Sequence, residues 1–201
     1  MKKVQLLVCG LFATMVLISC GNSANSDAET THGEEAVTTE ADANLPAAEG
    51  TLVATANLMS TADSTQPVGT ANFYQLENNQ IRLDVVIDYK DRADSNVAVH
   101  FHEHGDCGNK GDNSHGHWNP TNENHGEWGS ASYHLGDIGN IQLDANGHGT
   151  KSVTTDKWSV SGGDNDIIGK AIIVHGGTDD YTTQPTGNSG PRVGCGVITK
   201  I

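Results

Sequence analysis

The chain has 201 residues, with 25 acidic side chains against 11 Lys and Arg, and a formal net charge of −14. This charge excludes a nucleic-acid binder that relies on phosphate attraction. The longest apolar run lies within the first twenty positions, which excludes a polytopic membrane protein. The 24 glycines argue against a coiled coil or a mainly helical fold, because Gly is a poor helix former. The length favours one domain.

The N-terminal segment has the pattern of an export signal. Two lysines precede an apolar run, residues 4–18, that is shorter than the ~20 residues of a membrane-spanning helix. The run ends in Leu-Ile-Ser-Cys-Gly, which resembles a bacterial lipoprotein signal, in which the cysteine becomes the lipidated first residue. We expect residues 1–19 to be a signal peptide and Cys20 to carry lipid. An ordinary secretory signal with an incidental cysteine is the alternative.

Both interpretations place the mature chain outside the cytoplasm, and the lipoprotein one in the bacterial periplasm or cell envelope, with a lipid anchor as the sole membrane contact. Residues 20–49 then form an acidic tether, with no Lys or Arg and no hydrophobic period. Such a segment cannot bury enough apolar surface to offset its ordering entropy, so we expect it to be disordered. The folded domain is expected over residues 50–201.

Two cysteines, Cys107 and Cys195, remain in this domain. In an oxidising compartment two thiols most simply form a disulfide, and two free thiols are the alternative. A disulfide here would close a long loop, for which the chain-entropy model gives about 4–5 kcal/mol of stabilisation.

Strand patterns dominate the domain. Apolar residues alternate with mostly polar ones over residues 81–90, the period of a half-buried strand. Tight turns are expected at 77–80 and 144–147. The shorter candidate strands are 52–59, 71–76, 97–102, 140–143, 151–155, 170–175 and 193–199. About eight short antiparallel strands predict an all-β fold, a Greek-key β-sandwich or flattened barrel.

Two long segments, 103–133 and 176–191, fit no strand and are rich in Gly, Asn, Asp and His. Loops of this length in a compact domain are usually functional or disordered. Histidines in and beside them favour function. His100 and His102 end an apolar strand, where a period of two points both rings to one face. Further candidate ligands are His117, His125, His134, Asp137 and His175.

An imidazole-rich set suits copper or zinc, and one carboxylate among nitrogens suits zinc. Eight motifs carry these residues in order over residues 51–201. They are His100-Phe-His102-Glu, Gly105-Asp-Cys107, Gly116-His117-Trp-Asn-Pro120, His125-Gly126, His134-Leu-Gly-Asp137, Gly139-Asn140, Val174-His175 and Gly187-Asn-Ser-Gly190-Pro-Arg192-Val-Gly-Cys195-Gly. Their order and spacing closely resemble those of the copper/zinc superoxide dismutases, which share the β-sandwich architecture.

The resemblance implies one copper and one zinc ion per subunit. The implied copper ligands are His100, His102, His117 and His175; the implied zinc ligands are His117, His125, His134 and Asp137. His117 belongs to both sets because the family bridges its metals with one imidazolate, which two cations keep deprotonated. Asp179 aligns with a family carboxylate that hydrogen-bonds the far nitrogens of His100 and His125. Cys107 and Cys195 match the family disulfide.

The implied activity is dismutation of superoxide to dioxygen and hydrogen peroxide, by alternating reduction and reoxidation of copper beside a structural zinc. It would serve antioxidant defence outside the cytoplasm. The catalytic residues would be His117, which takes up and delivers a proton, and Arg192, whose guanidinium binds the superoxide anion.

One departure from the family concerns charge. Residues 176–191 lack the lysines that many relatives carry after the last copper ligand, so guidance of the anion rests on Arg192 and on basic residues elsewhere, such as Lys110. His104 and His115, each two residues from an implied ligand, are assigned to loop or surface positions.

Three alternatives use the same residues. A non-enzymatic extracytoplasmic copper/zinc buffer needs the ligands but not Arg192. A zinc-poor or copper-only relative and a structural sandwich with relic ligands are disfavoured, because no ligand is missing. Superoxide is the expected partner, and no nucleic acid is expected. Family members occur as dimers and as monomers, so a homodimer stays open.

Overall fold

The computed structural model describes residue 45 and residues 49–201. The predicted signal peptide (1–19), the predicted lipidation site Cys20 and nearly all of the predicted tether (20–49) lie outside the described residues, so the domain boundaries remain a prediction. Within the described part of the chain, no helix is long and apolar enough to span a membrane.

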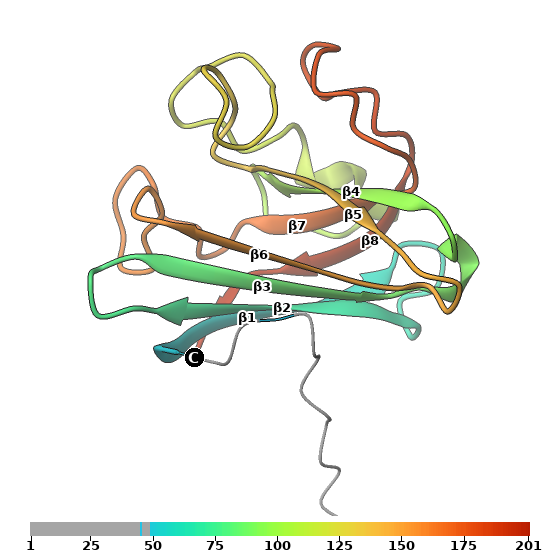
Figure 1. Cartoon of the computed structure of the whole chain (residues 1–201), viewed down its shortest axis with the longest axis horizontal. Helices are drawn as coiled ribbons and strands as arrows, with labels where there is room; N and C mark the ends of the chain where they lie inside the picture. The colour runs from blue at the N-terminus through green and yellow to red at the C-terminus, as the bar shows by residue number, and fades with distance from the viewer. Residues whose placement is uncertain (1–44, 46–48) are drawn as a thin grey trace, which may run out of the picture. The chain divides into compact units, whose positions relative to one another are not determined.

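The described residues form nine strands in one antiparallel sheet, which curls into a nearly closed barrel (Figure 1). The strands are β1 (Thr51–Ser60), β2 (Pro67–Gln75), β3 (Ile81–Asp88), β4 (Asn96–His102), β5 (Asp137–Gln142), β6 (His148–Thr155), β7 (Ala171–His175), β8 (Arg192–Val197) and β9 (Thr199–Lys200). Their spatial order is β5-β4-β7-β8-β1-β2-β3-β6, with the short β9 beside β1. Pairs such as β4–β7 and β8–β1 join strands distant in sequence, which requires crossovers of the Greek-key kind. The predicted all-β class is confirmed.

The inward face of β3 follows the predicted alternation, but its other face is more covered than a half-buried strand suggests. Arg82 and Asp84 are each only 5% exposed. Nη2 of Arg82 lies 3.2 Å from Oδ2 of Asp84, and the guanidinium lies 4.7 Å from the centre of the Tyr74 ring. Buried charges are tolerated when they are paired, so this ion pair allows a second buried layer on β3.

The predicted strands are present with shifted ends. β5 begins at Asp137 rather than 140, and β6 at His148 rather than 151. The strand expected over 193–199 is interrupted at Ile198, whose N–H donates to the carbonyl of Lys170 while its own carbonyl accepts from Gly169. Pairing with a neighbouring loop therefore splits β8 from β9. The predicted turn at 144–147 is closed by a hydrogen bond of 2.9 Å from the Gly147 N–H to the Asp144 carbonyl.

Two long loops, residues 103–136 between β4 and β5 and residues 176–191 between β7 and β8, rise from the same side of the barrel in Figure 1. The first contains a short 3-10 helix, η2 (Asn109–Ser114). A second, η1 (Lys90–Arg92), precedes β4. A third connection, residues 156–170, is almost as long, and the sequence analysis did not single it out. Its Trp158 Nε1 donates to the Leu135 carbonyl at 3.0 Å, so this connection helps to hold the end of the first loop in place.

A disulfide joins Cys107 in the first loop to Cys195 in β8, with 5.7 Å between their Cα atoms. Cys195 pairs with Ile173 of β7, so the loop is fastened to a strand in the middle of the sheet. The alternative of two free thiols is wrong.

Removing this crosslink by Cys107→Ala together with Cys195→Ala should lower the free energy of unfolding by about 4–5 kcal/mol, because the bond closes an 88-residue loop. Urea unfolding of the oxidised protein and the variant measures the difference. Reduced wild-type protein is the matched control and should unfold like the variant. Identical midpoints for the oxidised protein and the variant would contradict this role.

Candidate metal centre

Strand geometry accounts for the first cluster of histidines. His100 and His102 alternate along β4 with Val99 and Phe101, which pack in the barrel core. Both histidines therefore leave the opposite face of the strand, beneath the long loops. β7 pairs with β4, and His175 at its end lies opposite Ala98. His117 completes the cluster, since its backbone forms an isolated bridge with that of His102.

The donor atoms of His100, His102, His117 and His175 lie within 4.8 Å of one another, and all four residues are buried. Nε2 of His102 is 3.4 Å from Nε2 of His175. The opposite nitrogens of these two rings are tied to backbone, Nδ1 of His102 to the His115 carbonyl at 2.8 Å and Nδ1 of His175 to the Gly190 carbonyl at 3.2 Å. Nδ1 of His100 and Nε2 of His117 are buried without a hydrogen-bond partner. Four converging nitrogens, two of them without any hydrogen-bond partner, fit a bound cation such as copper.

A second group, His117, His125, His134 and Asp137, has its donor atoms within the same limit of 4.8 Å and is also buried. The Nδ1 atoms of the three rings surround the Asp137 carboxylate at 2.9, 3.0 and 3.2 Å, in that order. The approaches of His125 and His134 lack hydrogen-bond geometry, so both Nδ1 atoms are left without such a partner. Three nitrogens and one carboxylate oxygen fit a tetrahedral zinc site. His117 faces the second group with Nδ1 and the first with Nε2.

Asp179 links the two groups. Its Oδ2 lies 2.8 Å from Nε2 of His100, and its Oδ1 lies 2.9 Å from Nε2 of His125. Glycine is required at position 187, where φ is +67°, because a Cβ there would collide with the Asp179 carboxylate and the His125 ring. The close packing of the second long loop thus fixes the carboxylate between one histidine of each group.

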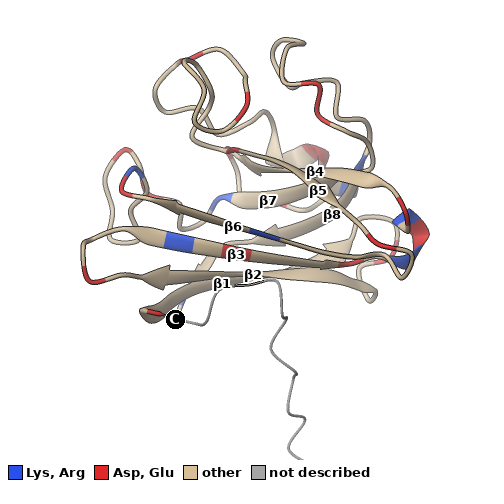
Figure 2. Ribbon diagram, in the orientation of Figure 1, with Lys and Arg blue, Asp and Glu red and all other residues tan. Residues whose placement is uncertain are grey.

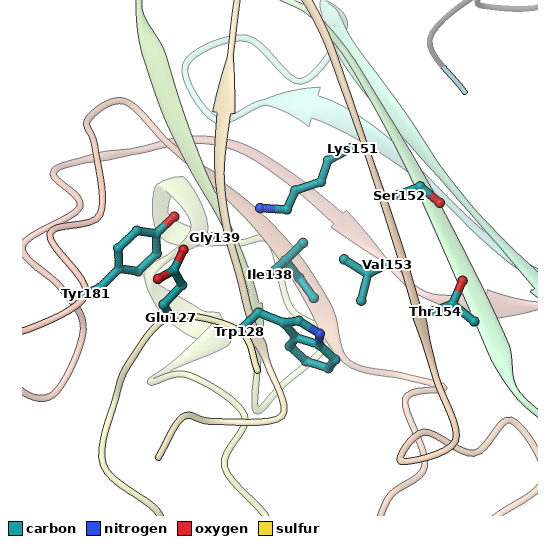
Figure 3. A pocket seen from close by; sticks show the side chains of 9 residues that line it. All are labelled: Glu127, Trp128, Ile138, Gly139, Lys151, Ser152, Val153, Thr154 and Tyr181. Carbon is teal, nitrogen blue, oxygen red and sulfur yellow. The ribbon is translucent and has the colours of Figure 1, made fainter. Parts of the chain in front are cut away.

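Asn140 supports Asp179 in a way that the sequence did not predict. Its Nδ2 donates to the Asp179 carbonyl at 2.9 Å, and its Oδ1 accepts from the Asp179 N–H at 2.8 Å. A cavity of about 350 Å³ lies behind this contact and is lined in part by Lys151 and Tyr181, whose side chains point toward Gly139 in Figure 3. Lys151 Nζ donates to the Asn140 carbonyl at 3.2 Å and the Asn140 N–H donates to Tyr181 Oη at 3.1 Å. Two residues that line the cavity therefore hold the backbone of Asn140, which in turn holds Asp179. None of the lining residues belongs to either group.

The protonation states of the first group suit metal ligands at neutral pH. Burial and the neighbouring His100 lower the pKa of His117 to about 4, and the same two causes lower the pKa of His175 to about 3. Burial also opposes protonation of His125, but the nearby carboxylates of Asp137 and Asp179 raise its pKa to about 9, so this ring holds a proton that a bound cation would displace. Although burial acts in the opposite direction, hydrogen bonds from histidines hold the pKa values of Asp137 and Asp179 well below their usual range. The first group is therefore neutral imidazole, and the carboxylates are ionised.

Arg192 lies beside the first group, at the start of β8 and opposite His175 in the sheet register. Its Nη1 donates to the Gly111 carbonyl at 2.5 Å and to Ser114 Oγ at 2.7 Å. Its Nη2 donates to the His115 carbonyl at 2.6 Å, the same carbonyl that contacts His102. The guanidinium is thereby held against η2 with 20% of the side chain exposed.

Sequence reasoning missed the backbone part of this arrangement. The His115 carbonyl serves both Arg192 and His102, yet every residue has a carbonyl, so no sequence signal marks it. The His115 and His104 side chains are exposed, as their surface assignment predicts. Lys110 is exposed within η2, next to the Gly111 that Arg192 contacts.

The fold and the two groups define a β-barrel protein with neighbouring sites for two transition-metal ions. Residues 67–198 match the family described as "Copper/zinc superoxide dismutase (SODC)". The "Superoxide dismutase [Cu-Zn]" of Yarrowia lipolytica is 37% identical over 137 residues, covering 65% of this chain and 88% of the relative. The "Extracellular superoxide dismutase [Cu-Zn]" of Caenorhabditis elegans is 34% identical over 143 residues, 68% of this chain and 63% of the relative.

Solved structures share the fold. A SOD-like protein from Bacillus subtilis superposes with a TM-score of 0.62 and 27% identity, over 71% of this chain and 96% of that one. The clock protein EA4 gives a TM-score of 0.64 and 30% identity, over 78% and 99% of the two chains. The chain belongs to the copper/zinc superoxide dismutase family. The predicted enzyme class, an oxidoreductase, and the predicted cofactors, copper and zinc, are confirmed.

Replacing Asp179 by Asn should weaken the binding of both metals by about 10- to 100-fold, because an amide cannot accept hydrogen bonds from His100 and His125 at both of its terminal atoms. Competition with chelators, followed by metal analysis, measures both affinities. Asp180→Asn is the matched control, since Asp180 is exposed and contacts the neighbouring threonines. A variant whose loss is confined to one metal would show that Asp179 does not couple the two groups.

Proposed function

We propose that this chain dismutes superoxide outside the cytoplasm at a copper ion that shares one histidine ring with a zinc ion. His100, His102, His117 and His175 hold the copper; His117, His125, His134 and Asp137 hold the zinc. The observation that carries the proposal is the placement of His117. Its Nδ1 lies 2.9 Å from Asp137, while its buried Nε2 has no hydrogen-bond partner and faces the other three rings. A ring in that position can bridge two cations, with one bound at each nitrogen.

Bound copper supplies the one-electron chemistry that converts two superoxide anions and two protons into dioxygen and hydrogen peroxide. The chain supplies the rest. His117 holds a proton at Nε2 in one half of the cycle and releases it to the product in the other, while Nδ1 stays in the second group. Asp179 keeps the rings of His100 and His125 oriented throughout, through its two carboxylate contacts.

Arg192 binds the anion. The net charge of −14 repels superoxide, and Figure 2 shows acidic residues spread over loops on several sides of the barrel. Attraction must therefore come from a local field. Arg192 is partly exposed beside the first group, and its guanidinium is fixed by Gly111, Ser114 and the His115 carbonyl. A guanidinium held in one position can bind a small anion without further ordering.

The same fixed guanidinium distinguishes an enzyme from a metal buffer. A buffer needs the two ligand groups, but it has no need for a cation held beside them, because positive charge disfavours metal binding. The hydrogen bonds that retain Arg192 next to His102 and His175 therefore support catalysis over storage.

Converting Arg192 to Glu should lower kcat/KM for superoxide by about 10- to 1000-fold, because it replaces local attraction by repulsion. Pulse radiolysis measures the rate, and metal analysis should show both metals retained. Lys90→Glu in η1 makes the same charge change at an exposed site and should leave the rate nearly unchanged. Equal losses in the two variants would mean that net charge alone matters; no loss in either would show that Arg192 does not attract the substrate.

The rate of the wild-type enzyme should fall modestly as ionic strength rises. Salt screens the attraction between superoxide and Arg192, but no lysine or arginine in residues 176–191 adds to it. The measurement is kcat/KM against salt concentration at constant pH. A rate that rises with salt would show that repulsion by the acidic surface dominates at the site, contrary to the local field assigned to Arg192.

We further propose that the chain is a bacterial lipoprotein of the periplasm or cell envelope, with residues 1–19 removed and residues 20–49 as a tether. The disulfide supports an oxidising compartment, and a relative described as extracellular agrees with export. The Leu-Ile-Ser-Cys sequence at positions 17–20 supports the lipid anchor. A homodimer remains an additional hypothesis.

Replacing Cys20 by Ser should move the protein from the membrane fraction to the soluble envelope fraction, because the thiol that carries the lipid is lost. Fractionation of a bacterial host with immunodetection measures this, and mass spectrometry of the wild type should show a lipidated N-terminal cysteine. Cys9→Ser, within the segment expected to be removed, is the control and should leave the distribution unchanged. A Cys20→Ser variant that stays membrane-bound would contradict the lipid anchor.

A further inference from the structure

A third cluster of potential ligands lies on the surface, outside both buried groups. One donor atom each from Glu103, His104 and His115 lie within 4.8 Å of one another, and all three residues are exposed. The two imidazole rings meet edge to face with their centres 4.4 Å apart. The mechanism proposed above uses none of these three side chains.

The backbone holds the cluster together. The Glu103 N–H donates to the Gly116 carbonyl at 3.1 Å, and the His104 N–H donates to the Ser114 carbonyl at 3.2 Å. These bonds place the end of β4 beside the segment that follows η2, so His104 and His115 face each other across two paired stretches of chain. The Cys107–Cys195 disulfide and the Arg192 contacts fasten the same loop to β8. The ligands are thus brought together by the fold before any cation binds.

The backbone at His115 adds to this fixed geometry. His115 adopts φ +63° and ψ −142°, a region that non-glycine residues rarely occupy. Its carbonyl accepts from both His102 and Arg192, and these two bonds hold the residue in that conformation. The His115 side chain is therefore presented to solvent in a defined direction. Among the described residues, no hydrogen bond or ion pair occupies the side chains of Glu103, His104 or His115.

We propose that Glu103, His104 and His115 form a third, surface site for a divalent transition-metal ion. Two imidazoles and one carboxylate are ligands for Zn²⁺ and Cu²⁺, and Cu²⁺ binds such a set more tightly. Exposure leaves the remaining coordination positions to water, so the cation exchanges more readily than one in a buried group. The site shares no ligand with those groups.

A cation at this site changes the charge near Arg192. The His115 carbonyl contacts the guanidinium directly, so the bound ion adds positive charge to the segment that presents Arg192. The chain as a whole has a net charge of −14, so this added positive charge is confined to the segment around Arg192.

Metal stoichiometry tests the site. The full chain, loaded with one equivalent each of copper and zinc, is dialysed against micromolar CuCl₂ or, separately, ZnCl₂, and the bound metals are counted by mass spectrometry. His104→Gln and His115→Gly should each bind one equivalent fewer than the wild type in the same dialysis. Glycine relieves the positive φ at position 115 and keeps the carbonyl, and His104→Gln tests the site independently if that variant folds poorly.

His148→Gln is the matched control, because His148 lies away from this cluster, beside Asp88. It should bind as much metal as the wild type. The copper arm adds a spectroscopic readout, since electron paramagnetic resonance of the wild type should show an additional Cu(II) signal that both cluster variants lack. Equal metal binding by the wild type and both cluster variants, or no binding beyond the two loaded equivalents, would overturn the proposal. Loss of metal in the control as well would assign the extra binding to scattered surface histidines.

Discussion

The structure depends on a set of imidazole nitrogens that the fold buries and the protein alone cannot satisfy. Six histidines are at most 5% exposed, and several of their ring nitrogens have no hydrogen-bond partner. Each buried polar atom left unpaired costs about 1–3 kcal/mol, so the apo barrel holds a substantial local penalty. Binding of cations removes that penalty, which makes metal affinity part of the folding free energy of this end of the barrel.

This penalty explains why the surrounding contacts are so numerous. Both long loops that enclose these nitrogens are fastened to the barrel. The disulfide ties the first loop to β8, Asp179 ties the second loop to a histidine of each group, and Asn140 fixes the backbone of Asp179. Most of these bonds hold the ligands in place indirectly. The donor sets are therefore largely formed before a metal arrives.

The ligand types and strand positions could be predicted from the sequence, and the support around them could not. Alternation along β4 placed His100 and His102 on one face, and the order of motifs supplied the other candidate ligands. The role of Asn140 was not predictable, because an Asn beside a Gly equally suits a turn. The His115 carbonyl left no trace in the sequence, since backbone acceptors are common to all residues. The burial of Arg82 and Asp84 depends on their mutual pairing, which strand alternation does not encode.

The acidic net charge of the chain is a further constraint, and the position of Arg192 offsets it near the first group of histidines. An acidic surface opposes an anionic substrate, and in the proposed mechanism one guanidinium acts against that background. Arg192 is suited to this role because η2 and the following His115 supply three acceptors for it, so its charge is fixed beside the first group of histidines. Asp112, 3.7 Å from Nε, faces the outer side of the same guanidinium. The strength of the proposed attraction therefore depends on how far this carboxylate, 70% exposed, is screened by water.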